Sequence, residues 1–221
     1  MADTVTAGTT WVNCGTVREA FGDSEGALVW FELARENYEK NLPPKDGRLG
    51  GLYNNMGLAL ASCRKFPECM EMFRKALSVM AGQPNGELEQ AITQLNMADA
   101  LEAELGSEGA EALLPEYLDE AARLLDAPHL PRDGYYAFVC GKCAPVFGHY
   151  GYFLEEAELK KGRRRFCGAD SPYCSWTGQA DCSGNCLRGR CSWTGHTACG
   201  RFPRSQAGRG ETPAVPKTFS Y

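Results

Sequence analysis

Two cysteines separated by two residues, Cys140 and Cys143, form the first arrangement in this chain that could bind a metal, and His149 follows a few residues later. Residues three apart share one face of a helix, so both thiolates could reach the same zinc ion. A structural zinc site needs a second pair of ligands, and the preceding helical patterns contain no further C-x-x-C or H-x-x-x-H pair. We therefore expect both thiols to pack as small apolar groups, and we predict no metal and no cofactor.

Six more cysteines crowd the last sixty residues, namely Cys167, Cys174, Cys182, Cys186, Cys191 and Cys199. Three interpretations of this segment stay open. A disulfide-bonded module would require an oxidising compartment. A zinc module, with Trp176 and Trp193 beside many arginines, would make a nucleic-acid surface conceivable. The third hypothesis, which we favour, is that the segment is the product of a GC-rich gene translated out of frame, so nucleic acid is an unlikely partner.

No known catalytic motif occurs in the sequence. There is no G-x-S-x-G, no phosphate-binding loop and no H-E-x-x-H, and the three histidines, His129, His149 and His196, have no evident nucleophile beside them. We therefore predict that the chain is not an enzyme. The alternative is a regulatory helical domain of an enzyme whose catalytic part is missing or scrambled after about Lys161.

Charge divides the chain into two unlike segments. Residues 1–161 carry 14 Lys and Arg against 25 Asp and Glu, whereas residues 162–221 carry 9 against 3. We expect the first segment to be a helical domain and the second to be a Cys-rich basic tail that lacks the apolar residues for a core. No apolar run is long enough to span a bilayer, and the start of the chain has no signal-peptide pattern, so we expect a cytoplasmic protein without membrane contact.

The stretch from Leu52 to Met80 predicts two amphipathic helices joined by a tight turn. Apolar or small residues follow helical spacing from Tyr53 to Leu60, a break falls at Arg64 and Lys65, and the pattern resumes from Cys69 to Leu77. Pro67 suits the first turn of the second helix because proline has no N–H to leave unpaired. One hairpin cannot bury both apolar faces, so the pattern requires neighbours.

A matching hairpin lies 42 residues upstream, where Gly15 corresponds to Gly57. The other matched pairs are Trp11 with Tyr53, Ala27 with Cys69, Phe31 with Phe73, and Ala34 with Ala76. This spacing of aromatic and small residues resembles the tetratricopeptide repeat, whose period is about 34 residues. The first copy covers about residues 8–41 and the second about 50–83, so Leu42–Leu49 is an inserted loop.

Two further hairpins are expected after the turn at Gln83–Gly86. We predict helices over about Glu87–Leu105 and Glu108–Leu125, the second capped by Ser107. A fourth pair should run from Asp133 to about Phe147 and from Tyr152 to Lys161. The predicted fold is therefore an all-α, tetratricopeptide-like solenoid of about three and a half helical hairpins over residues 1–161, followed by an irregular tail over residues 162–221.

The resemblance implies a protein or peptide partner held in a concave groove lined by the first helix of each hairpin. The sixth position of each repeat is Asn13, Asn55 or Asn96, and Asn54 lies beside Asn55. Because an amide both donates and accepts hydrogen bonds, these residues could hold the backbone of an extended peptide. The positions at which chaperone-binding members of the family carry Lys or Arg are not basic here. Instead, the groove is expected to be acidic through Glu19, Asp99 and Glu102.

Seven aromatic residues occur within residues 134–153: Tyr135, Tyr136, Phe138, Phe147, Tyr150, Tyr152 and Phe153. We expect them to form the packed end of the array, and a ligand pocket is the alternative. Such a cluster is also a possible surface for self-association.

Overall fold

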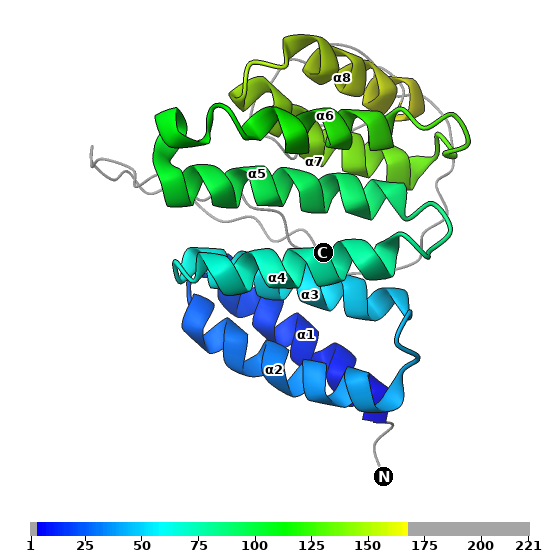
Figure 1. Cartoon of the computed structure of the whole chain (residues 1–221). Coiled ribbons are helices and arrows are strands. Elements are labelled where there is room, and N and C mark those ends of the chain that lie inside the picture. Colours follow the sequence, from blue (N-terminus) through cyan, green and yellow to red (C-terminus); the bar gives the residue numbers. More distant parts are fainter. Residues whose placement is uncertain (1–3, 168–221) are drawn as a thin grey trace, which may run out of the picture.

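The computed structural model describes residues 4–167, and the side chains of this range up to residue 162. Within these residues the chain forms helices and connecting turns without strands. The helices pair into four antiparallel hairpins that stack in sequence order (Figure 1). Their bounds are α1 Thr4–Ala20 with α2 Ser24–Asn41, α3 Gly47–Ser62 with α4 Phe66–Met80, α5 Glu87–Ala110 with α6 Leu114–Leu125, and α7 Gly134–His149 with α8 Phe153–Cys167.

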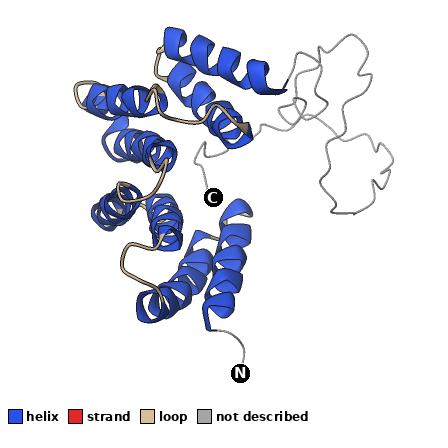
Figure 2. Cartoon of the chain, turned by 90° about the vertical axis from the view of Figure 1, so that its right-hand side faces the viewer, coloured by secondary structure: helices blue, strands red, loops and turns tan. Residues whose placement is uncertain are grey.

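The glycines that set the repeat register lie where the two helices of a hairpin cross. A Cβ added to Gly15 would lie 2.4 Å from Cε1 of Phe31, and a Cβ added to Gly57 would lie 2.4 Å from Cε1 of Phe73. Both phenylalanines are completely buried. The same contact in two hairpins explains the 42-residue offset and confirms an all-α solenoid of helical hairpins (Figure 2).

Three helices begin directly after an aspartate whose carboxylate caps the first turn. The carboxylate of Asp23 accepts a hydrogen bond from the Gly26 N–H at the start of α2, and that of Asp46 accepts one from Arg48 at the start of α3. Asp133 accepts two such bonds at the start of α7. Each carboxylate satisfies a backbone N–H that has no partner within its helix, which fixes the first residue of the helix.

The third hairpin departs from the prediction. Its second helix, α6, begins at Leu114 instead of Glu108, and the helical turn after Ser107 belongs to α5. Gly106 interrupts α5 with φ 74° and ψ 165°, a conformation that only glycine adopts without strain. The Ser107 hydroxyl donates to Glu102 Oε1 over 2.7 Å, and α6 carries no side-chain cap and has a proline in its first turn.

The outer limits of the helical domain also differ from those expected. Helix α1 begins at Thr4, before the first repeat copy expected from about residue 8, and α8 continues past Lys161 to Cys167. The predicted boundary between residues 161 and 162 therefore falls inside a helix. The hypotheses on the cysteine-rich tail concern residues that, beyond Cys167, lie outside the described range.

Apolar side chains between the hairpins form the core. One cluster joins the first two hairpins around Phe31, Tyr38 and Met56, and another joins the last two around Leu118 and Phe147. No helix among the described residues is sufficiently long and apolar to cross a membrane.

Candidate binding surface

The two cysteines of the C-x-x-C pair lie inside the core of the fourth hairpin. Cys140 and Cys143 are fully buried on α7, and burial raises the pKa of both thiols above their ordinary range. Nε2 of His149 lies 3.1 Å from Oε2 of Glu102 on α5. Within residues 4–162, no three side chains of His, Cys, Asp or Glu are grouped so that they could hold a metal ion. The two thiols thus occupy the packing role that the sequence predicts.

The predicted asparagine ladder is buried between helices instead of lining an open groove. Oδ1 of Asn54 accepts hydrogen bonds from Nδ2 of Asn96 over 3.0 Å and from the Thr93 hydroxyl over 3.1 Å. Nδ2 of Asn55 points at the Thr16 hydroxyl over 3.5 Å. At most 1% of the surface of each of these three asparagines is exposed. The expectation that they are free to hold a peptide backbone is therefore wrong for all three.

The reason is the close approach of the first helices of successive hairpins. The polar groups of α3 are satisfied by α1 on one side and by α5 on the other, as buried amides require. Asn13 occupies the same repeat position as Asn55 but is exposed. It lies on α1, the first helix of the stack (Figure 2). Among the four predicted asparagines, only Asn13 lies on an accessible surface.

The predicted acidic residues do lie near the surface, and each accepts hydrogen bonds from the next first helix. Oε1 of Glu19 accepts from the Ser62 hydroxyl over 2.8 Å. Oδ1 of Asp99 accepts from the Tyr150 hydroxyl over 2.8 Å. Glu102 interacts with His149 and with Tyr150, the latter over 3.2 Å. These carboxylates join α1 to α3 and α5 to α7 through the hydrogen bonds that they accept.

Burial and hydrogen bonding act on Glu102 in opposite directions. Burial raises the pKa of this carboxyl, but the hydrogen bonds from Ser107, His149 and Tyr150 together outweigh burial and hold the pKa below its ordinary value. Burial, with the nearby carboxylates of Asp99 and Glu102, raises the pKa of Tyr150 far above its usual range, so its hydroxyl remains a donor.

Beside these carboxylates, α7 presents aromatic side chains whose contacts with α5 the sequence did not predict. The Tyr135 hydroxyl donates to Oε1 of Glu89 over 2.9 Å, and the Tyr135 and Phe138 rings stack with their centroids 6.1 Å apart. Phe138 is 53% exposed, and Nζ of Lys142 lies 5.5 Å from its ring centroid. The i, i+3, i+7 spacing of these three residues could have indicated a common helix face.

We call this surface the acidic–aromatic seam. It lies where the first helices of the third and fourth hairpins meet, and it consists of Glu89, Asp99 and Glu102 on α5, with Tyr135, Phe138, His149 and Tyr150 on α7 or at its end. The predicted aromatic cluster is thus divided between two roles. Tyr136 and Phe147 are buried in the core, whereas Tyr135, Phe138 and Phe153 are exposed.

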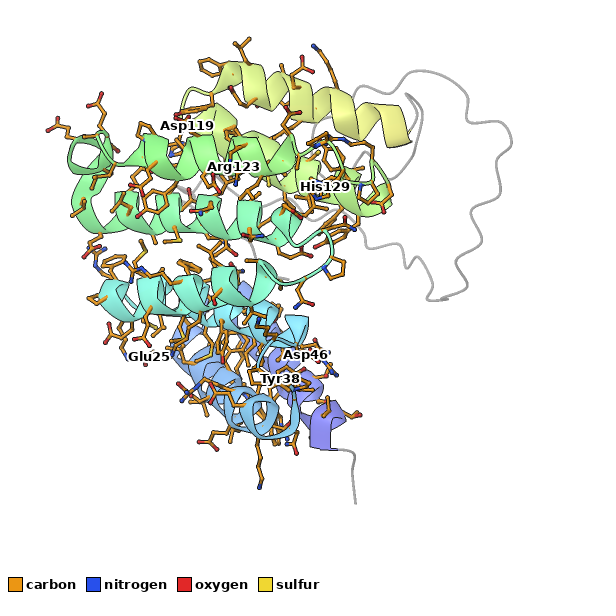
Figure 3. All side chains as sticks on the ribbon, turned by 45° about the vertical axis from the view of Figure 1, so that its right-hand side comes forward. Glu25, Tyr38, Asp46, Asp119, Arg123 and His129 are labelled. Carbon is orange, nitrogen blue, oxygen red and sulfur yellow. The ribbon has the colours of Figure 1, made fainter. Side chains whose placement is uncertain are left out.

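A hollow with a volume of about 760 Å³ lies between α6, α7 and α8, apart from the acidic–aromatic seam. Leu125, Phe147 and Leu159 contribute apolar surface, and Arg123 reaches its edge from α6 (Figure 3). Arg132 stacks on the Tyr136 ring, 4.2 Å from its centroid, and donates to the Leu125 carbonyl over 3.0 Å. The charged groups at the edge of this hollow are of both signs, so it has no single electrostatic character.

Comparison with known proteins adds information on the fold alone. No family model matches the sequence, and no curated protein matches it. Among solved structures, the chain is similar to the crystal structure of BtubC (BKLC) from P. vanneervenii, with a TM-score of 0.50 and 14% sequence identity. The match covers 86% of this chain and 73% of that one. At this identity the likeness supports the helical architecture and carries no functional conclusion.

Proposed function

We propose that this chain is a protein-binding or peptide-binding scaffold or sensor module of the tetratricopeptide type. The repeated Gly15–Phe31 and Gly57–Phe73 crossings, within a solenoid of helical hairpins, support the family assignment. A solenoid presents one long surface to a partner, because each hairpin contacts only its neighbours and leaves a face uncovered. The five cysteines whose side chains the structure describes are free thiols, which suits a reducing, cytoplasmic compartment.

The acidic–aromatic seam is the observation that carries this proposal. Glu89, Asp99 and Glu102 accept hydrogen bonds from Tyr135, Tyr150 and His149, and Phe138 presents an exposed ring on the same helix as Tyr135. A carboxylate attracts Lys and Arg, and an aromatic face binds cations or apolar side chains. We therefore expect the ligand to be an extended segment of another protein that carries basic and apolar side chains.

A panel of extended peptides, varied in basic and apolar content, tests the proposal by fluorescence anisotropy. Phe138→Ala combined with Glu89→Gln should weaken a bound basic–apolar peptide by about tenfold or more, because both the ring and one charge are lost. Glu71→Gln is the matched control, since Glu71 is an exposed acid on α4 that pairs with Lys75 over 2.8 Å. Equal affinity of parent and seam variant would refute the assignment of the seam as the binding surface.

A further inference from the structure

A hollow of about 700 Å³ adjoins the acidic–aromatic seam at the end of α5 and shares Glu102, His149 and Tyr150 with it. It lies between the last turn of α5, the start of α6 and the turn that joins α7 to α8. The last turn of α5 and the turn between α7 and α8 lie on the same side of the stack (Figure 1). A ligand that follows the seam along α5 therefore reaches this hollow.

Two glycines turn the backbone around this hollow. Gly106 interrupts α5 with φ 74°, and Gly151 follows α7 with φ 81°, a backbone conformation that favours glycine. The turn after Gly106 carries Glu108 and Glu111 to the hollow, and the turn at Gly151 carries Tyr152 there. The shape of the hollow therefore depends on backbone conformations that other residues adopt only with strain.

Apolar and aromatic side chains form part of its wall. Leu114 and Leu118 of α6 line the hollow and are almost completely buried. The Tyr152 ring lines it as well, and the rings of His149 and Tyr150 meet edge to face with their centroids 4.7 Å apart. Such a wall accepts the methylene groups of a long side chain, and an aromatic face attracts a cation.

The charged side chains that line the hollow are acidic. They belong to Glu102, Glu108 and Glu111, and neither Lys nor Arg occurs among the lining residues, whereas the hollow between α6, α7 and α8 has groups of both signs. Glu102 already accepts hydrogen bonds from His149 and Tyr150. Glu108 and Glu111 are exposed, and within residues 4–162 they form no ion pair. We call this cavity the acidic hollow.

We propose that the acidic hollow binds an arginine side chain of the segment that the seam holds, an inference that rests on the function proposed above. The planar fork of N–H donors in a guanidinium suits two carboxylates at once, here those of Glu108 and Glu111. The guanidinium plane stacks on aromatic rings such as that of Tyr152, and the arginine stem packs against Leu114. The ammonium group of lysine is a compact and strongly hydrated charge, so it gains less from such a wall.

Titration of the full chain with N-acetyl-arginine amide tests the acidic hollow without a peptide. Binding is followed by ¹H–¹⁵N NMR under reducing conditions and at about 0.15 M salt, so that weak long-range attraction is screened. We expect saturable shifts of the amide signals around Glu102, Leu114 and Tyr152, with a Kd of about 1–10 mM. N-acetyl-citrulline amide, the uncharged isostere, should not bind. Shifts that do not saturate up to about 50 mM, or equal affinity for the two compounds, would overturn the proposal.

Glu108→Gln combined with Glu111→Gln should weaken binding of the arginine amide by about fivefold or more, because two carboxylates are lost. Both residues are exposed, so the fold should be retained. Glu104→Gln combined with Glu116→Gln is the matched control, since these exposed glutamates of α5 and α6 lie outside the lining and their loss changes the net charge equally. Equal affinities of the two double variants would attribute the effect to net charge and would overturn the assignment.

The peptide panel separates this proposal from the function on which it rests. In a peptide bound at the seam, replacement of its arginine by citrulline should weaken binding to the parent by about fivefold or more, and should have little effect in the variant that lacks Glu108 and Glu111. A peptide that is weakened by Phe138→Ala with Glu89→Gln, but not by this replacement, would retain the scaffold function and overturn the acidic hollow. Saturable binding of the arginine amide without binding of any peptide would support the acidic hollow and refute the seam.

Discussion

The side chain of Asn54 joins the second hairpin to the third through two buried hydrogen bonds. Its carbonyl oxygen accepts from both Thr93 and Asn96, and all three residues are buried. Loss of a buried acceptor removes a partner from each donor, at a cost that exceeds the net gain of the original hydrogen bond, although the Thr93 hydroxyl keeps its bond to the Glu89 carbonyl. Asn54 and Asn96 therefore serve stability and the spacing of the hairpins.

Asn54→Ala should lower the free energy of unfolding by about 1–3 kcal/mol, because the Asn96 amide and the Thr93 hydroxyl lose a buried acceptor. Thermal and denaturant unfolding followed by circular dichroism would measure the change. Asn13→Ala is the control, since Asn13 is exposed, and it should change stability by no more than about 0.5 kcal/mol. Similar effects of the two substitutions would contradict the structural role assigned to Asn54.

At the scale of the elements, each of the first two hairpins is held by a ring that fills the space left by a glycine. Phe31 lies against Gly15 and Phe73 against Gly57, with the same distances to the position of an added Cβ. The neighbouring crossings repeat this arrangement, because Gly8 faces Tyr38 and Gly50 faces Met80. Two close approaches seven residues apart therefore fix the angle and the register of each hairpin.

Gly57→Ala should destabilise the fold by about 1–3 kcal/mol, because the new methyl group would lie 2.4 Å from the fully buried Phe73 ring and would force it to move. Gly82→Ala offers a comparison, since the nearest atom to its added Cβ is the Val79 carbonyl oxygen at 3.6 Å. That variant should stay within about 0.5 kcal/mol of the parent. If Gly57→Ala were equally neutral by chemical denaturation, the tight crossing would be disproved.

At the scale of the whole molecule, the fourth hairpin is joined to the third through carboxylates. Tyr135, His149 and Tyr150 on α7 or at its end contact Glu89, Glu102 and Asp99 on α5, and Tyr152 donates to Asp119 on α6 over 2.9 Å. Apolar clusters join both pairs of hairpins, but fewer carboxylates join the first two, where Glu19 accepts from Ser62 and Glu39 accepts from Tyr53. The stability of the C-terminal half of the stack should therefore depend more strongly on pH than the stability of the N-terminal half.

The lowered pKa of Glu102 determines the direction in which stability changes with pH. In the unfolded chain a glutamate titrates near about 4.3, so between that pH and the lower folded pKa the unfolded state binds more protons. The stabilisation by Glu102 is complete above the unfolded pKa and is lost as the pH falls through the folded pKa. Glu102→Gln should therefore lower stability at pH 7 by about 1–3 kcal/mol, and by much less near about pH 3.

Unfolding measured between pH 7 and about pH 3 should show that the free energies of unfolding of the parent and of Glu102→Gln converge as the pH falls. Hydrogen exchange would place the pH-dependent opening in α7 and α8. Glu71→Gln again serves as the control; the bond from Lys75 also lowers the pKa of this glutamate, but Glu71 is exposed and joins no two hairpins. A constant difference between Glu102→Gln and the parent at all pH values would rule out the proposed linkage.

The sequence alone determined the helical hairpins, because helix periodicity, small residues at crossings and aspartate caps are local patterns that need no knowledge of neighbours. Thus the Gly15 and Gly57 register, and the starts of α2, α3 and α7, follow from the chain itself. Only the tertiary structure decided what covers each face. Asn13 and Asn55 occupy the same repeat position, yet Asn13 is exposed and Asn55 is buried, because α3 lies between α1 and α5, whereas among the described helices α1 has a first helix on one side only. Likewise, the kink at Gly106 and the meeting of Glu102 with His149 depend on how the hairpins stack, which no spacing within one helix encodes.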